Sequence, residues 1–270
     1  MQLKLWGVRG SIPTPVPGYL SCGGNTTCLE IRGSEDVLII DAGSGARELG
    51  GHLQAEFGFA CIDVHFLLTH FHWDHIQGIP YFAPVYSPGT EISFYSTYPP
   101  ERLQAVLEAQ MTAPYYPIEL MDTPSIKTYK QLGPEPLRAV GLTVHPFPLN
   151  HPQGATGYRI EGDGAVLVHA SDFEHGDPKL DHTIREYAQN ADVLIFDAQY
   201  TPEEYISHKG WGHSTWLEAT KVARECKVKR LVLFHHDPRH DDKWMESILR
   251  DARKHFEATD LAKEGLEIVL

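Results

Sequence analysis

The feature that most constrains this chain is a dense group of metal-binding side chains directly after an apolar run. Residues 63–69 have the composition of a buried strand, and His70, His72, Asp74 and His75 follow within six positions. Residues two apart on an extended chain point to the same side, so His70 and His72 can bind one cation while Asp74 and His75, beyond a bend, face a neighbouring one. A solvated polar loop is the alternative interpretation, but three imidazoles directly after a core strand argue against it. The segment therefore predicts two adjacent metal sites.

Three further donors stand where strand-like runs end, as a two-metal site requires. His151 follows an apolar run, Asp172 follows residues 165–169, and His235 follows residues 230–234. Taken alone, each has an ordinary structural explanation, as a capping carboxylate or as an imidazole bonded to local backbone. Taken with the first group, they predict the remaining ligands of the two sites.

The last ligand position has two adjacent candidates, His235 and His236, whose side chains point different ways. We choose His235 because it is the first residue beyond the strand. His236 is then expected in the outer shell of the site or in the substrate cleft, and we assign it to substrate binding.

Chain length and composition limit the remaining possibilities. The 270 residues suffice for a large core, and no apolar run approaches the ~18 residues that a bilayer span needs. The amino terminus lacks the pattern of a secretory signal, so a cytoplasmic location is expected. The net charge of −13 disfavours a polyanionic partner, which favours a small substrate over nucleic acid. Without CxxC spacing, a zinc knuckle or redox pair is not expected, and buried or idle thiols are predicted for Cys22, Cys28, Cys61 and Cys226.

Hydrophobic periodicity predicts strands in two runs, with helices closing each run. Strands are expected at residues 2–9, 28–32, 36–40, 63–69, 126–131, 142–145, 156–161, 165–169, 192–197 and 230–234. Helices are expected at residues 44–57, 99–111, 181–190, 215–226 and 242–258. The fold class is therefore α/β (α+β), a four-layer αββα sandwich with two sheets face to face and helices outside. Because no linker or low-complexity segment interrupts the pattern, residues 1–270 are expected to form a single domain.

The HxHxDH segment with later His, Asp and His ligands resembles the metallo-β-lactamase superfamily. The resemblance covers the chain almost end to end and implies that Asp172 bridges two divalent ions. It implies that one ion takes His70, His72 and His151, and the other takes Asp74, His75 and His235. Asp41 matches an acidic residue of the family that supports the site without being a principal ligand, although a helix cap is an equally good explanation of Asp41. Zinc is the expected metal, and the ligand types also permit manganese or iron.

Residues outside the ligand set point to one branch of this superfamily. No cysteine stands among the ligands, unlike the lactamases that use a thiolate, and His72 stands where the redox di-iron branch has a glutamate. The segment Gly212-His213-Ser214-Thr215 begins a helix with a T-x-x-E capping box, and free amides at such a start suit a phosphate. It resembles the His-Ser-Thr motif of tRNA 3′-processing endonucleases and related small phosphodiesterases. A capped helix that follows a histidine by chance is the alternative, and it would leave His213 without a role.

Four further short segments of the sequence resemble phosphoribosyl cyclic phosphodiesterases and cyclic-nucleotide phosphodiesterases. They are residues 6–11 (Trp-Gly-Val-Arg-Gly-Ser), 23–26 (Gly-Gly-Asn-Thr), 197–200 (Asp-Ala-Gln-Tyr) and 211–214 (Trp-Gly-His-Ser). The acidic balance, and the absence of a long basic, Gly-rich insertion like the tRNA-gripping arm, argue against a true tRNA processor. The prediction is a dinuclear phosphodiesterase that hydrolyses a small cyclic nucleotide or cyclic phosphate through a metal-bridging hydroxide.

The resemblance also assigns roles within this reaction. Asp74 would bind metal and orient the hydroxide, and His213 would stabilise phosphoryl charge or protonate the leaving group. Ser214 and Thr215 would bind the phosphate. Alternative functions are a thioester or lactone hydrolase with the same metals, a tRNA 3′-processing endonuclease, and a binding module without turnover. A homodimer is also conceivable, with the apolar residues 81–86 as either interface or core, and core is favoured.

Overall fold

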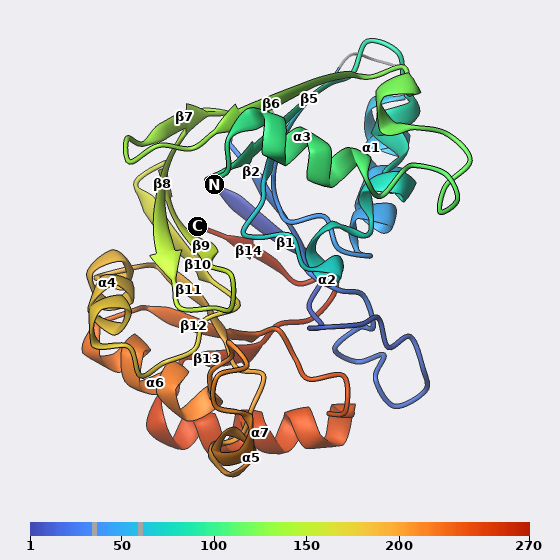
Figure 1. Cartoon of the computed structure of the whole chain (residues 1–270). Coiled ribbons are helices and arrows are strands. Elements are labelled where there is room, and N and C mark those ends of the chain that lie inside the picture. The colour runs from blue at the N-terminus through green and yellow to red at the C-terminus, as the bar shows by residue number, and fades with distance from the viewer. Residues whose placement is uncertain (34–36, 59–61) are drawn as a thin grey trace.

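A computed structural model describes residues 1–33, 37–58 and 62–270, and within them the strands form two sheets. The first sheet has seven strands in the order β14-β1-β2-β3-β4-β5-β6 (Figure 1). In that order the strands are β14 (Glu267–Val269), β1 (Gln2–Gly7), β2 (Cys28–Arg32), β3 (Val37–Ile40), β4 (Asp63–Leu67), β5 (Glu91–Ser96) and β6 (Ile126–Gln131). Strands β14, β1, β2 and β3 pair antiparallel, whereas β3, β4, β5 and β6 run parallel.

The second sheet also has seven strands, in the order β13-β12-β11-β10-β9-β8-β7. They are β13 (Thr259–Leu261), β12 (Arg230–Phe234), β11 (Val193–Asp197), β10 (Ala165–Ala170), β9 (Ala155–Gly162), β8 (Leu142–Leu149) and β7 (Leu137–Ala139). Strands β10 to β13 run parallel and β7 to β10 pair antiparallel.

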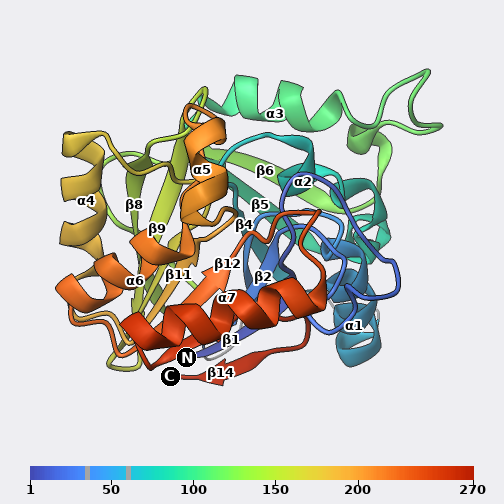
Figure 2. The ribbon, with the colours of Figure 1, turned by 90° about the horizontal axis from the view of Figure 1, so that it is seen from below.

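Helices cover the outer face of each sheet, which makes four layers (Figures 1 and 2). Helices α1 (Ala46–Phe57) and α3 (Pro100–Glu108) share an apolar cluster with the first sheet. Helices α4 (Pro178–Ala188), α6 (Trp216–Glu225) and α7 (Asp242–His255) share another with the second sheet. A third cluster joins inward residues of both sheets, such as Leu38 and Leu167. The predicted αββα sandwich is therefore confirmed.

One end of the sandwich carries the chain segments that hold the predicted ligands. The short helix α2 (Trp73–Ile76) follows β4, and loops follow β8, β10, β11 and β12. At this end the two sheets are joined directly, because the amide of Thr156 at the start of β9 donates to the carbonyl of Thr69 beyond β4 over 2.9 Å. Parallel neighbours end at the same edge of a sheet, which is why donors far apart in sequence meet here.

The structure also holds elements that the sequence pattern did not predict. These are β5, β7, β13, β14, α2 and α5 (Pro202–His208), most of which are short and depend on pairing or packing with distant segments. Within residues 81–86, Phe82 and Val85 are fully buried, in agreement with the core interpretation, whereas Tyr81 is 60% exposed. Cys22, Cys28 and Cys226 are buried free thiols, and Cys61 lies outside the described residues. Among the described helices none is both long enough and apolar enough to cross a bilayer.

Candidate metal centre

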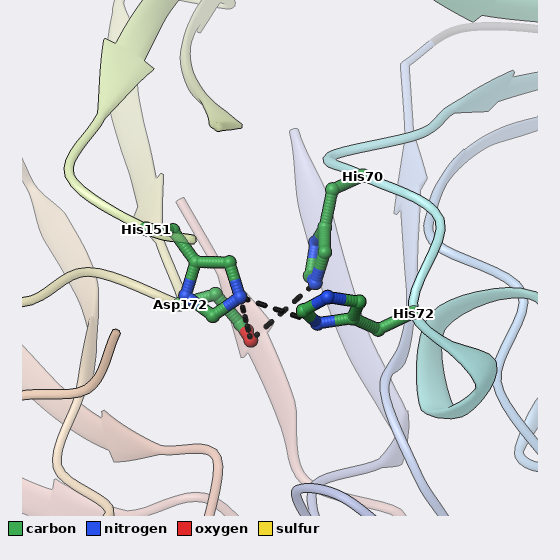
Figure 3. A group of neighbouring side chains, drawn as sticks. All are labelled: His70, His72, His151 and Asp172. Carbon is green, nitrogen blue, oxygen red and sulfur yellow. Dashed lines mark hydrogen bonds and ion pairs between the residues drawn. The ribbon is translucent and has the colours of Figure 1, made fainter. Parts of the chain in front are cut away.

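The first donor group contains three imidazoles and one carboxylate at the edge between the sheets (Figure 3). Nε2 of His70 and Nε2 of His151 each lie 3.7 Å from Oδ2 of Asp172. Nδ1 of His72 lies 3.2 Å from Nε2 of His151. One donor atom from each of these four residues lies within 4.8 Å of the others. This spacing places four donors around a common centre, as a cation site requires.

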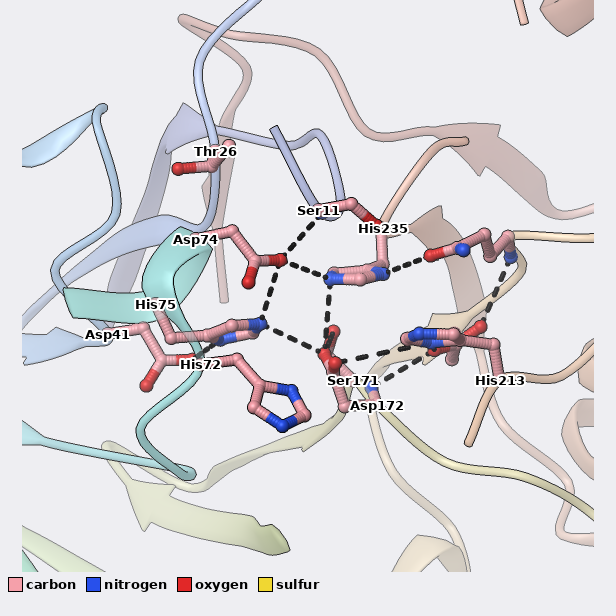
Figure 4. Close-up of polar contacts among 12 residues, drawn as sticks. Ser11, Thr26, Asp41, His72, Asp74, His75, Ser171, Asp172, His213 and His235 are labelled. Carbon is pink, nitrogen blue, oxygen red and sulfur yellow. Dashed lines mark hydrogen bonds and ion pairs between the residues drawn. The ribbon is translucent and has the colours of Figure 1, made fainter. Parts of the chain in front are cut away.

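The second donor group contains Asp74, His75 and His235 (Figure 4). Oδ2 of Asp74 lies 3.3 Å from Nε2 of His235 and 3.4 Å from Nε2 of His75. The other carboxylate oxygen of Asp172, Oδ1, lies 3.3 Å from both of these imidazole nitrogens. Asp172 thus presents one oxygen to each donor group. All seven side chains that the sequence predicted as ligands meet here, and their ligand roles stay a prediction.

The chemistry of the donor set fits divalent cations. Nε2 of His70 and Nε2 of His75 are buried without a hydrogen-bond partner, although buried polar atoms are normally satisfied. Asp41, Asp74 and Asp172 are all at most 5% exposed, so three carboxylates share one buried region. Buried negative charges need positive partners, and two cations between these atoms would satisfy both the carboxylates and the orphaned nitrogens.

The pKa shifts of Asp74 and Asp172 describe carboxylates held ionised. Burial alone would raise the pKa of Asp172, but the charges of His235 and His75 outweigh it and hold the pKa well below its usual range. The pKa of Asp74 is likewise lowered by His75 and His235 against the effect of burial. For His70, burial and the charge of His75 lower the pKa, which favours the neutral imidazole that a metal needs.

Asp41 orients His75 of the second donor group through the ring nitrogen that does not face the site. Its Oδ2 lies 2.7 Å from Nδ1 of His75 and accepts from the Thr69 hydroxyl over 2.8 Å, and its Oδ1 accepts from the Thr69 amide over 2.8 Å. These bonds leave Nε2 of His75 to face the site. The alternative role of Asp41 as a helix cap is wrong, because Gly45 is the N-cap of α1 and Asp41 bonds to other residues. This contact between an imidazole and a carboxylate is the usual outer support of a metal ligand.

His213 enters the site beside the two donor groups. Its Nδ1 lies 2.8 Å from Oδ2 of Asp197 and 4.0 Å from Oδ2 of Asp172. Burial alone would lower the pKa of His213, but the carboxylate of Asp197 outweighs it and raises the pKa to about 9. Sequence reasoning missed Asp197 as a functional residue. Asp197 is the last residue of β11 and Asp172 lies two residues beyond β10, so both stand near the end of a strand.

Gln199 and Glu174 are two further residues that sequence reasoning missed. Oε1 of Gln199 lies 2.8 Å from Nδ1 of His235. The carboxylate of Glu174 accepts from the amides of Gly210 and Gly212 over 2.6 and 2.8 Å. The carbonyl of Gly212 in turn accepts from Nδ1 of His151 over 2.9 Å. Glu174 therefore holds the loop that orients His151, and no local sequence signal marked this role.

Backbone geometry at the site is unusual for non-glycine residues. Asp41, Asp172 and His235 have φ values of 58°, 61° and 60°, in the left-handed region. Such conformations cost free energy and persist where the surrounding structure enforces them, which is common at functional sites. Gly212 also has positive φ, at 91°, and a Cβ there would lie 2.2 Å from Nδ1 of His151. Glycine is thus required where this loop passes the ligand.

The three residues assigned to substrate binding all have hydrogen-bond partners within the protein. His236 is fully buried, and its Nε2 donates to the carbonyl of Ala262 over 2.9 Å, so its ring does not reach the cleft. The hydroxyl of Ser214 lies 2.7 Å from Nδ1 of His175. The hydroxyl of Thr215 accepts from the amide of Glu218 over 3.1 Å, which confirms the helix cap.

Two amides at the start of α6, those of Ser214 and Trp216, are already bonded within the protein, contrary to expectation. The amide of Ser214 donates to Oδ1 of Asp197 over 3.0 Å, and the amide of Trp216 donates to the carbonyl of Tyr200 over 3.3 Å. Because protein atoms already use these donors, a phosphate does not have them available.

Comparison with known proteins agrees with this geometry. The family model described as "Beta-lactamase superfamily domain" matches residues 36–236. The chain belongs to this superfamily. The metallo-β-lactamase fold protein YhfI from Bacillus subtilis has a TM-score of 0.74 at 20% identity, over 99% of this chain and 98% of that chain. A diphosphatase from the PhnP family has a TM-score of 0.71 at 18% identity, over 100% of this chain and 97% of that chain.

One curated relative of this chain is the protein named Ribonuclease Z from Thermoplasma acidophilum. It is 25% identical over an alignment of 308 positions, which covers 99% of this chain and 95% of the relative. The recognised family, its fold and the clustered His and Asp donors agree with the prediction of a metal-dependent hydrolase. This protein is therefore a metal-dependent hydrolase.

Proposed function

We propose that this protein is a phosphodiesterase that acts on nucleotide phosphodiesters and uses two divalent cations. Zinc is the first metal to expect in both sites. The observation that carries the proposal is the position of Asp172, which presents one oxygen to each of two donor groups. When bound, two adjacent cations activate water and neutralise charge on phosphoryl oxygens. We also propose that residues 1–270 act as one hydrolase domain, since the donors come from segments of both sheets.

The side chains of the protein have distinct tasks in this proposal. Oδ2 of Asp74 accepts from the amide of Ser11 over 2.7 Å, which fixes the carboxylate and leaves Oδ1 to accept a hydrogen bond from the attacking hydroxide and orient it. Nδ1 of His213 is bonded to Asp197, so its Nε2 is left to donate a proton to the leaving oxygen. The carboxylate of Asp197 raises the pKa of His213, which favours the protonated imidazole that an acid needs.

Among nucleotide substrates, the relatives favour RNA over the small cyclic diester expected from the sequence. The curated relatives include proteins named Ribonuclease Z and, from Escherichia coli O6:K15:H31, Ribonuclease BN, the latter 23% identical over 98% of both chains. RNA 3′-end processing, which was the alternative in the sequence prediction, is therefore the first substrate reaction to test.

The small phosphodiester remains the second candidate because of charge. The net charge of −13 gives no long-range attraction for a polyanion. The alignment with the Ribonuclease Z relative has 308 positions, more than the 270 residues of this chain, so the relative carries segments that this chain lacks. Both candidates contain nucleosides, and Trp73 and Trp211, 68% and 61% exposed beside the site residues, offer ring faces for stacking.

The test compares substrates at matched metal loading. Zinc- and manganese-loaded protein would be incubated with a precursor tRNA bearing a 3′ trailer, a 2′,3′-cyclic nucleotide, bis(4-nitrophenyl) phosphate and a thioester. We expect cleavage of phosphodiesters, lost in Asp172→Ala and retained in Asp192→Asn, which removes a carboxylate charge outside the site. Turnover of the thioester alone would refute the proposal, and the ratio of tRNA to cyclic nucleotide cleavage decides between the two substrates.

A further inference from the structure

A cavity of about 550 Å³ lies directly beside the metal centre. It is bordered by the segment Thr69–Phe71 after β4, by the ends of β5 and β6, by β8, and by residues 153–156 after His151. His70 lines the cavity and also belongs to the first donor group. The cavity therefore adjoins the first donor group at His70, next to the position proposed for the phosphate.

The lining of this cavity differs in charge from the metal centre. Among the lining residues of the described chain, none is Asp, Glu, Lys or Arg, and His70 is the only titratable imidazole. The walls consist largely of prolines, aromatic rings and aliphatic side chains, among them Phe71, Tyr98, Leu132 and Pro148. A second phosphate would find no cationic side chain in this lining, whereas an uncharged ring system would replace water against apolar walls.

Aromatic rings and a neutral amide are both present in the lining of the cavity. The ring centres of the lining residues Phe71 and Tyr98 lie 4.8 Å apart, and the guanidinium of Arg102 lies 4.0 Å from the centre of the Tyr98 ring. The amide of Gln153 is exposed in the loop after His151. Rings for stacking and amides for hydrogen bonds are what a nucleobase edge and face require.

We propose that this cavity binds the nucleoside part of one ester group while the phosphate lies at the metal centre. The proposal rests on the proposed phosphodiesterase function and specifies its substrate class. A volume of about 550 Å³ lies within the range of roughly 300–1,000 Å³ that is typical of small-molecule sites. The site selects for a phosphodiester with an uncharged, ring-bearing substituent and against a simple alkyl ester.

Two esters with the same leaving group isolate this contribution. These are the 4-nitrophenyl ester of thymidine 5′-phosphate and methyl 4-nitrophenyl phosphate, each with metal-loaded protein. We expect kcat/KM of the wild type to favour the nucleoside ester by roughly tenfold or more, the size of one base stacked on an aromatic ring. Equal rates on both esters in the wild type would overturn the proposal.

Variants locate the preference in the cavity. Tyr98→Ala removes one ring, and Gly133→Trp adds bulk at a lining position where a Cβ meets no atom within 4 Å. Both should reduce the preference to within about threefold of unity and leave the methyl ester nearly unaffected. Tyr115→Ala, which removes an 81% exposed ring outside the lining, is the matched control and should keep the preference. An unchanged preference in both cavity variants would contradict the proposal.

A binding measurement separates this proposal from the proposed function. Calorimetric titration of metal-loaded wild type with thymidine 5′-monophosphate should give saturable binding that weakens roughly tenfold in Tyr98→Ala. If neither ester is hydrolysed but this binding occurs and depends on Tyr98, the phosphodiesterase function fails and the cavity assignment stands. If the esters are hydrolysed without binding of the nucleotide in the cavity, the cavity assignment fails alone.

Discussion

Replacing Asp41 by Asn tests whether the Asp41 carboxylate orients His75 for metal binding. Asp41 is fully buried and accepts from the amide and the hydroxyl of Thr69, and it contacts Nδ1 of His75. The amide of Asn has one accepting oxygen, so its NH₂ group must face either the Thr69 amide or the His75 N–H, both of which are donors. A buried donor left unsatisfied costs about 1–3 kcal/mol. Loss of a carboxylate that supports a metal-binding histidine lowers metal affinity by about 10- to 100-fold.

The assay is competition with a chelator, which yields the apparent Kd of the bound ions, together with urea unfolding of the metal-free protein. Asp192→Asn is the matched control, because Asp192 also accepts from a backbone amide, that of Val166, but lies away from the donors. We expect metal affinity to fall in Asp41→Asn and to stay unchanged in Asp192→Asn. If Asp41→Asn retained wild-type affinity, the orienting role of Asp41 would be refuted.

Three further predictions follow from individual contacts. In metal-free protein, Asp197→Asn should lower the pKa of His213 from about 9 toward its ordinary value, which NMR titration measures. Glu174→Gln should destabilise the Gly210–Gly212 loop by about 2 kcal/mol and weaken metal binding through His151, as thermal unfolding with and without zinc would report. Burial lowers the pKa of His236 to about 3, so the folded state cannot take up the proton that the unfolded state binds below about 6.5. Stability should therefore fall as the pH falls from 7 to 5, by about 2 kcal/mol more in the wild type than in His236→Gln.

The donor groups could be predicted from sequence because their signals are local. His70, His72, Asp74 and His75 share one segment, and Asp172 and His235 each follow a strand with clear apolar patterning. Position at a strand end is a topological rule, so it holds without knowledge of distant contacts.

The partners of these ligands could not be predicted in the same way. The role of Glu174 depends on the amides of Gly210 and Gly212, which only the folded chain brings near. Free amides were expected at the start of α6 because a capping box is recognised from only four neighbouring residues. The atoms that bond the Ser214 and Trp216 amides belong to Asp197 and Tyr200, which come from another strand and the loop after it. Strands β13 and β14 have three residues each and form only through pairing with β12 and β1.

The central claim is that seven side chains hold two divalent cations that share Asp172. Elemental analysis of purified, metal-loaded protein, combined with anomalous diffraction at the metal edge, measures this most directly. The account predicts about two ions per chain, with separate peaks beside His70 and beside His235 and with Asp172 between them. A folded protein that retains no divalent ion, or that holds a single ion away from Asp172, would contradict it.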